Sequence, residues 1–211
     1  QNVLLYTQTN PAATSQGSVT ITTDVGATAV NLPNGSFNIA SAGDLTLTTG
    51  PSVNATGNTG GASQGAAAPP PSITARDVKL SAAGTININD GYAIHASNRI
   101  SVSAGLDLNI TNSSELKRIA NSDILGMLLE STGGNVNVDG SGGAVTLQGS
   151  DVELRSNTGN VSLNMANISA DILKVATLSS TGEIIIGNST LSASNSIKLY
   201  AQGANGTVHF V

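Results

Sequence analysis

The sequence predicts an all-β fold, a single-stranded parallel β-helix of about seven or eight coils, each with three short strands. Three observations predict it. Short runs in which every second residue is apolar recur along the chain, which is the period of a strand with one buried face. The runs return after 22 residues, from Val78 to Ile100 and from Ile86 to Leu108. Gly, Asn, Ser and Ala, which favour tight turns, separate them.

Three rows of apolar residues can be followed from coil to coil. Row one is expected to contain Val78, Ile100, Met127, Val152, Val175 and Ile197. Row two is expected to contain Ile86, Leu108, Val136, Val161, Ile184 and Val208. Row three is expected to contain Ile94, then Leu116 or Ile119, then Val145, Ile168 and Leu191. Because one coil cannot bury its apolar face alone, stability must come from stacking.

The N-terminal part continues the same pattern backward. Phe37 precedes Val78 by 41 residues, and Leu45 precedes Ile86 by the same 41. One coil of 22 residues and a further 19 account for this interval, so we expect a loop insertion at 50–72 that leaves the stack. This tract is rich in Gly and Ala and contains three consecutive prolines, which cannot join a strand ladder.

A second irregularity follows the row-two residue Leu108. Leu116, Ile119, Ile124 and Leu128 have mixed helical spacing, and Ser113 or Ser114 is a plausible N-cap. We therefore expect a short helical insertion at 113–126 before the row-one strand resumes near Met127. From residue 133 onward the repeat is regular again.

Composition limits the function classes. Residues 1–211 are expected to form one β-helix domain, because the repeat covers almost the whole chain. Only 10% of the residues are charged and the net charge is −5, which disfavours nucleic-acid binding because phosphate neutralisation needs clustered Lys and Arg. The chain has no cysteine and no segment typical of a signal peptide or a transmembrane helix. We interpret it as part of a longer exported protein, with adjoining coils as its neighbours.

The sequence contains no convincing catalytic, cofactor-binding or metal site. Its aspartates fall at different coil positions, so no acid/base pair is predicted. Asp77 and Arg99 occupy one position in consecutive coils, where an exposed ion pair would be structural. The glycine-rich stretch 133–143 resembles calcium-binding nonapeptide repeats, but it occurs once and has one Asp. His95 and His209 have no metal-ligand partner by spacing.

The outward residues of row two form a different kind of candidate site. They are Asn, Thr or Ser in most coils and carry no charge. The possible contact face, called the neutral face below, consists of Thr20, Thr46, Asn87, Asn109, Asn137 and Ser162, followed by Ile185 and His209 in the last coils. Stacked Asn and Thr side chains can bind one another along the rod, which would be a structural role. Carbohydrate contact or side-by-side association of rods would use the same face.

A repeated phrase, Gly-x-apolar-x-apolar, runs through the chain as GSVTI, GDLTL, GTINI, GAVTL, GNVSL, GEIII and GTVHF. It resembles the repeats of filamentous haemagglutinin and related large Gram-negative exoproteins, over 73–211 and, less closely, 17–49. The resemblance implies a right-handed parallel β-helix that is secreted or surface-exposed and serves adhesion. The Asn-Pro-Asn motifs of that family's secretion domain are not found here, where residues 32–35 read Leu-Pro-Asn-Gly.

We therefore expect a non-catalytic structural and binding segment of a secreted or surface-exposed bacterial adhesin. Expected partners are host or bacterial surface glycans or proteins, without nucleic acid, without insertion of this segment in a membrane, and without a cofactor. One alternative is a β-helical carbohydrate-active enzyme of the polysaccharide lyase or hydrolase type. That enzyme would need three or more charged side chains converging on one groove. Another alternative is a pure stalk or spacer.

Overall fold

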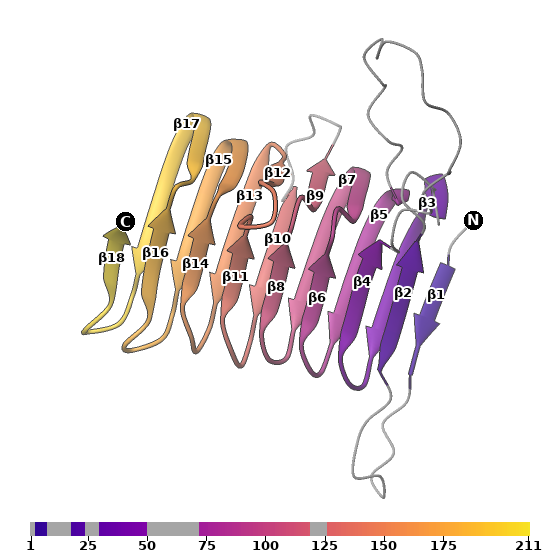
Figure 1. The fold of residues 1–211 in the computed structure, drawn as a ribbon, viewed down its shortest axis with the longest axis horizontal. Helices are drawn as coiled ribbons and strands as arrows, with labels where there is room; N and C mark the ends of the chain where they lie inside the picture. The colour runs from indigo at the N-terminus through magenta and orange to yellow at the C-terminus, as the bar shows by residue number, and fades with distance from the viewer. Residues whose placement is uncertain (1–2, 8–17, 24–29, 50–71, 119–125) are drawn as a thin grey trace, which may run out of the picture.

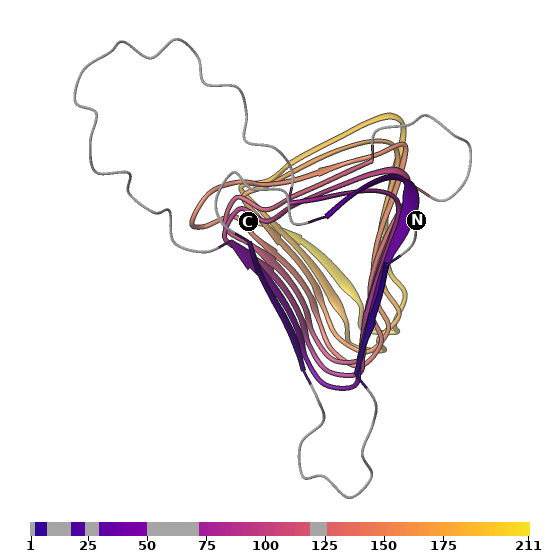
Figure 2. The same cartoon turned by 90° about the vertical axis from the view of Figure 1, so that its right-hand side faces the viewer.

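A computed structural model of the chain describes residues 3–7, 18–23, 30–49, 72–118 and 126–211. Within these ranges the protein is an elongated solenoid whose parallel strands lie side by side along one axis (Figure 1). Viewed along that axis, the coils superpose around a triangular outline (Figure 2). No described residue is helical, so this part of the chain contains no helix that could cross a membrane. The predicted all-β parallel solenoid is confirmed.

Row two forms one parallel sheet of eight strands. The strands are β2 (Val19–Thr23), β4 (Leu45–Thr49), β6 (Ile86–Asn89), β8 (Leu108–Thr111), β11 (Val136–Asp139), β14 (Val161–Asn164), β16 (Glu183–Gly187) and β18 (Thr207–Phe210). All six residues predicted for row two are successive partners: Ile86, Leu108, Val136, Val161, Ile184 and Val208. The row-two prediction is therefore confirmed residue by residue.

Rows one and three belong to a single sheet of ten strands, because five long strands bend from row three into row one. These are β3 (Val30–Ser41), β5 (Ile73–Ala82), β7 (Ala93–Ala104), β15 (Ala166–Thr177) and β17 (Thr190–Ala201). Shorter strands occupy one row each: β1 (Val3–Tyr6), β10 (Met127–Ser131) and β13 (Asp151–Ser156) in row one, β9 (Glu115–Arg118) and β12 (Val145–Gln148) in row three. Irregular pairing marks the bend, as between Ala75 and Asp77.

Two predicted register assignments are wrong by two residues. Val152 pairs with Leu173, so Leu173 is the row-one residue and Val175 pairs with Leu154. In row three, Leu147 is the partner of Ile168, whereas Val145 pairs with Ala166. A shift of two residues leaves the same side chains inside, so the apolar pattern cannot distinguish the two registers.

Within the predicted helical insertion at 113–126, residues Glu115–Arg118 form strand β9 and not a helix. Leu116 of β9 pairs with Ile94 on one side and Leu147 on the other, and its side chain is fully buried. It is thus the row-three member that the sequence left open between Leu116 and Ile119. Burial alternates from residue to residue along β9, as in a strand, so tertiary packing and not the helical spacing of the apolar residues decides the local structure. Residues 119–125 lie outside the described part, as does the predicted loop at 50–72 apart from Ser72.

The core is one continuous column of aliphatic side chains inside the solenoid. Tyr92 and Phe37 are the largest side chains in it. Side-chain hydroxyls at the end of row one donate hydrogen bonds to main-chain carbonyls at the corner that leads into row two. Ser156 donates to the carbonyl of Gly134 at 2.6 Å, and Thr177 donates to the carbonyl of Gly159 at 2.6 Å. Buried main-chain groups at this corner are thereby bonded to the neighbouring coil.

The solenoid makes about six turns, slightly fewer than the seven or eight coils that the spacing predicts. Its outer layers are less complete than its middle, since the first described layer consists of β1 and β2 alone. At the other end, the side chains of Ile197 and Phe210 are 44% and 71% exposed. Middle coils, with a partner on both sides, should therefore be more stable than terminal ones.

Leu129→Ala tests this dependence on stacking. Leu129 is fully buried between Val102 and Leu154, so its truncation should lower the free energy of unfolding by about 2–5 kcal/mol. Leu199→Ala, in the partly buried last coil, should cost clearly less because Leu199 pairs with Val175 on one side only. Urea denaturation followed by circular dichroism measures both, and equal losses would contradict a stability built on neighbouring coils.

One turn contains a residue that its backbone does not favour. Asp90, Asn112, Met165 and Asn188 all follow a row-two strand and all have positive φ, between 47° and 56°. Asp and Asn tolerate this left-handed conformation, whereas the Met165 side chain does not and is 41% exposed.

Met165→Asn should therefore stabilise the protein by about 1 kcal/mol, because it removes the strain of an unfavourable residue at φ 49°. Met165→Leu, which keeps an apolar side chain in the same conformation, is the matched control and should give no gain. Thermal unfolding measures the difference, and a lower melting temperature for the Asn variant would show that the methionine side chain makes a contact of its own.

Candidate functional site

The neutral face is a straight column on the outside of the row-two sheet. Thr20, Thr46, Asn87, Asn109, Asn137 and Ser162 are successive Cα partners, and Ile185 and His209 continue the column. Each side chain stands next to its equivalent in the following coil because parallel strands in register repeat every layer. The structure therefore brings all the predicted residues together on one face.

The three asparagines of this face bind one another. Asn109 donates from Nδ2 to Oδ1 of Asn87 at 2.9 Å, and Asn137 donates to Oδ1 of Asn109 at 2.9 Å. Such an amide ladder stabilises the stack and orients each side chain. Part of the hydrogen-bonding capacity of the neutral face is thus used within the protein.

A second polar column lies beside the neutral face at the ends of the row-two strands. Thr111 donates to Oδ1 of Asn89 at 3.0 Å, and Asn164 donates to Oδ1 of Asp139 at 2.9 Å. The hydrogen bond from Asn164 and the backbone N–H of Ser141 hold the pKa of Asp139 below its ordinary value, despite some burial. The column is a structural device in which a carboxylate is kept ionised.

Charged residues gather on the outer face of row one, which sequence reasoning missed. Arg155 donates to Glu130 at 2.8 Å and lies 3.5 Å from Glu153, and Lys174 donates to Glu153 at 3.0 Å. Glu130 is the direct partner of Arg155, and Glu153 that of Lys174, in adjacent coils. The signal was present as alternating charges in the strands of row one, but it needed the correct coil register to become visible.

The first coils of row one carry a separate group around Asp77. Asp77 and Arg99 are Cα partners as their spacing indicates, yet the carboxylate binds Arg76 at 2.7 Å and Asn98 at 2.6 Å. Burial alone would raise the pKa of Asp77, but the hydrogen bonds from Arg76, Asn98 and Ser36 lower it further than burial raises it. Asp77 is thus held as an ionised structural acceptor.

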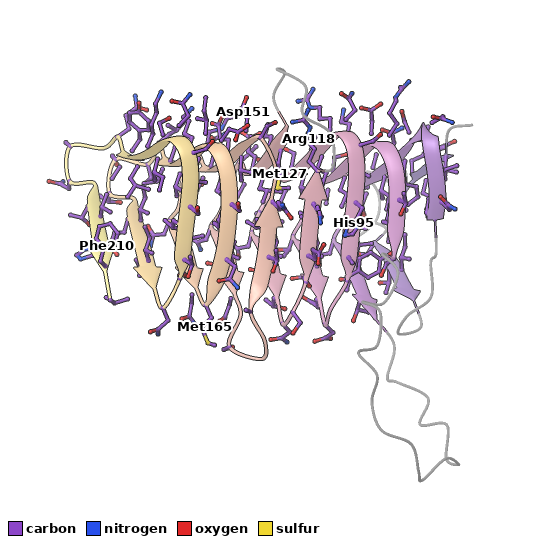
Figure 3. All side chains as sticks on the ribbon, turned by 90° about the horizontal axis from the view of Figure 1, so that it is seen from above. His95, Arg118, Met127, Asp151, Met165 and Phe210 are labelled. Atoms are coloured by element: carbon purple, nitrogen blue, oxygen red, sulfur yellow. The ribbon has the colours of Figure 1, made fainter. Side chains whose placement is uncertain are left out.

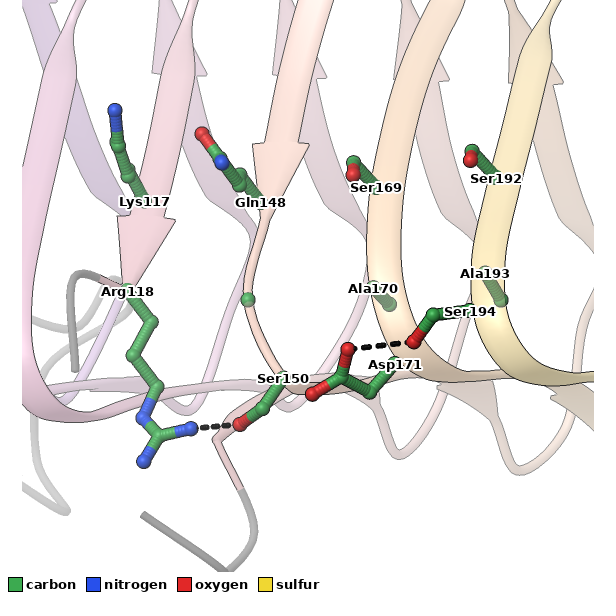
Figure 4. A pocket seen from close by; sticks show the side chains of 11 residues that line it. Lys117, Arg118, Gln148, Ser150, Ser169, Ala170, Asp171, Ser192, Ala193 and Ser194 are labelled. Carbon is green, nitrogen blue, oxygen red and sulfur yellow. Dashed lines mark hydrogen bonds between the residues drawn. The ribbon is translucent and has the colours of Figure 1, made fainter. Parts of the chain in front are cut away.

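A hollow of about 390 Å³, here called the corner groove, lies where row three bends into row one (Figure 4). Its lining comes from four consecutive coils and includes Lys117, Arg118, Gln148, Ser169, Asp171 and Ser192. Arg118 is buried and bridges two layers, donating to the carbonyl of Asn98 at 2.5 Å and to the hydroxyl of Ser150. Figure 3 shows Arg118 and Asp151 on the opposite edge of the solenoid from Met165.

Neither histidine belongs to a metal-binding group within the described ranges. His95 Nε2 lies 2.7 Å from Glu115 in the next coil, and His209 Nε2 lies 3.8 Å from Glu183. Across residues 3–7, 18–23, 30–49, 72–118 and 126–211, no three His, Cys, Asp or Glu side chains are placed to hold a metal ion. Asp139, in the glycine-rich stretch 133–143, instead accepts hydrogen bonds from Asn164 and Ser141.

No protein-family model, curated protein or solved structure matches this chain.

The lowered pKa of Asp139 generates a pH prediction. Its ionised form stabilises the fold above the ordinary Asp pKa of about 3.9, and this stabilisation is lost as the pH falls through the lower folded pKa. Asp139→Asn, which keeps an acceptor for Asn164, should show a weaker loss of stability on acidification. Melting temperatures of both proteins across this acidic range test it, and parallel pH profiles would contradict the role given to Asp139.

Proposed function

We propose that the chain is a non-catalytic structural and binding segment of a bacterial adhesin that is secreted or displayed at the cell surface. The observation that carries the proposal is the straight, uncharged column from Thr20 to Ser162, held in register on one continuous sheet. Regularly spaced hydroxyls and amides on a stiff support favour many weak contacts with a repetitive partner. Surface glycans and proteins of host or bacterial cells are partners of this kind.

The resemblance of the Gly-x-apolar-x-apolar phrase to haemagglutinin-type exoproteins supports the surface location. The outermost strands of the row-two sheet, β2 and β18, each have one neighbour within the described residues. An edge with free N–H and C=O groups is a template for another strand. Adjoining coils of a longer chain are the partner proposed for these edges.

A carbohydrate-active enzyme is the second candidate, and the corner groove is the observation that favours it. Lys117, Arg118 and Asp171 all line it, so three charged side chains belong to one groove, although they do not converge on one point. Asp171 is the one carboxylate in the lining, however, and Lys117 lies two coils away, about 10 Å along the axis. Glycoside hydrolysis ordinarily uses two carboxylates, so binding is the better-supported role.

The proposal predicts binding without turnover. The folded chain is tested against surface glycans, extracellular-matrix proteins and whole cells, and in parallel for release of reducing or unsaturated ends from polysaccharides. A double variant with Thr46→Lys and Ser162→Lys places charge on the neutral face and should reduce partner binding at least about tenfold.

Ser101→Lys and Ser103→Lys on the outer face of row one form the matched control, which adds the same charge elsewhere. The control should bind as the unmodified chain does. Absence of binding to every partner, together with clear turnover of a polysaccharide that Asp171→Asn abolishes, would replace the proposal by the enzyme candidate.

A further inference from the structure

The corner groove contains a column of polar side chains that the fold does not use. Lys117, Gln148, Ser169 and Ser192 are successive partners on the outer face of row three. Figure 4 shows these four side chains following one another across the strands. Among the described residues none of the four makes a side-chain hydrogen bond or ion pair, unlike the asparagines of the neutral face, which bind one another at 2.9 Å.

A second line of polar groups runs along the same groove. Ser150, Asp171 and Ser194 follow the column at the bend, and Ser194 donates to Oδ1 of Asp171 at 2.7 Å (Figure 4). Asp171 is exposed, so its carboxylate can accept further hydrogen bonds. Between the two lines lie Ala170, which is buried in the core, and Ala193, which is partly buried, so the floor between them carries no polar side chain.

The dimensions fit an extended ligand that lies along the axis of the solenoid. Four coils contribute to the groove, and at about 4.8 Å per layer they span about 14 Å. Donors and acceptors therefore recur once per layer: an ammonium, an amide and two hydroxyls in one line, a carboxylate and two hydroxyls in the other. A ligand that matches this pattern must itself repeat polar groups along its length.

Two other classes of extended ligand fit less well. A peptide that binds as an added strand needs an unpaired edge. Strands β9, β12 and β15 are paired on both sides, and the free edge of β17 would align a peptide along that strand and not across the coils that line the groove. A polyanion needs clustered cations, whereas the groove lining combines Lys117 with the carboxylate of Asp171, and the guanidinium of Arg118 already binds Asn98 and Ser150. A neutral chain of hydroxyl groups meets neither obstacle.

We propose that the corner groove is a binding site for a neutral oligosaccharide that runs along the solenoid axis. Lys117, Gln148, Ser169 and Ser192 bind successive hydroxyl and ring oxygens, Asp171 accepts from a sugar hydroxyl, and a C–H face of the sugar packs on Ala193, which is only partly buried. This inference rests on the proposed function, since it names one ligand of the binding segment, but it assigns that ligand to a surface other than the neutral face.

The test uses an array of extended neutral, uronate-containing and sulfated oligosaccharides, followed by calorimetric titration of the neutral oligosaccharide that binds best. Ser169→Trp and Ser192→Trp fill the groove from two exposed positions, outside the core. Each should lower the affinity at least about tenfold. Gln148→Ala removes hydrogen-bonding groups without adding bulk and should cause a smaller loss. Ser101→Trp, the same bulky change on the outer face of row one, is the control and should leave the affinity unchanged. Thr46→Trp reports whether the oligosaccharide binds the neutral face instead.

Circular dichroism and melting temperature establish that each variant is folded. Loss of binding in Ser169→Trp but not in Thr46→Trp supports the corner groove. The reverse result overturns the groove while retaining the proposed function, because the oligosaccharide would then bind the neutral face. Preference for sulfated over neutral chains overturns the assignment of a neutral ligand. Absence of any oligosaccharide binding also overturns it, and the proposed function is then judged by the protein and cell partners alone.

Discussion

Every part of this protein depends on the pairing of each coil with the coils on either side. A strand of four residues such as β6 or β8 has too little buried surface to be stable alone. Paired in parallel on both edges, the same strand satisfies its backbone and places Ile86 on Leu108 and Leu108 on Val136. The backbone beneath the outer faces is held in place by this pairing, because each middle strand is hydrogen-bonded to the layers on both sides.

The same pairing arranges the polar side chains into columns, and these columns differ in whether their members are hydrogen-bonded within the protein. On the neutral face, Asn87, Asn109 and Asn137 bind one another, and at the row-one corner Ser156 and Thr177 bind carbonyls of the neighbouring coil. In the corner groove, the column of Lys117, Gln148, Ser169 and Ser192 has no such partners among the described residues. A column that stabilises the stack and a column that is free to bind a ligand thus arise from one geometry and differ in side-chain type.

The groove lies where the solenoid is least regular. Long strands such as β7 and β15 pass from row three into row one without interruption, whereas the two coils between them divide into β9 and β10 and into β12 and β13. Arg118 crosses this region, bonded to the coil before it and the coil after it. A buried, hydrogen-bonded arginine keeps the layers in place where the strands are interrupted, and the hollow beside it is the corner groove.

The sequence by itself determined the fold class, the complete row two and the alignment of the neutral face, because these follow from a strict alternation repeated at a nearly constant interval. It did not determine that Leu173 pairs with Val152. Val175 faces the same interior, and the apolar pattern is the same when the strand register shifts by two residues. Nor did it determine that Leu116 lies in a strand, since short apolar runs suit helix and strand alike. The corner groove and the network around Arg155 were decided only by the tertiary structure. Both join side chains from different coils, and the register that brings them together is set by backbone pairing and by the bend between rows.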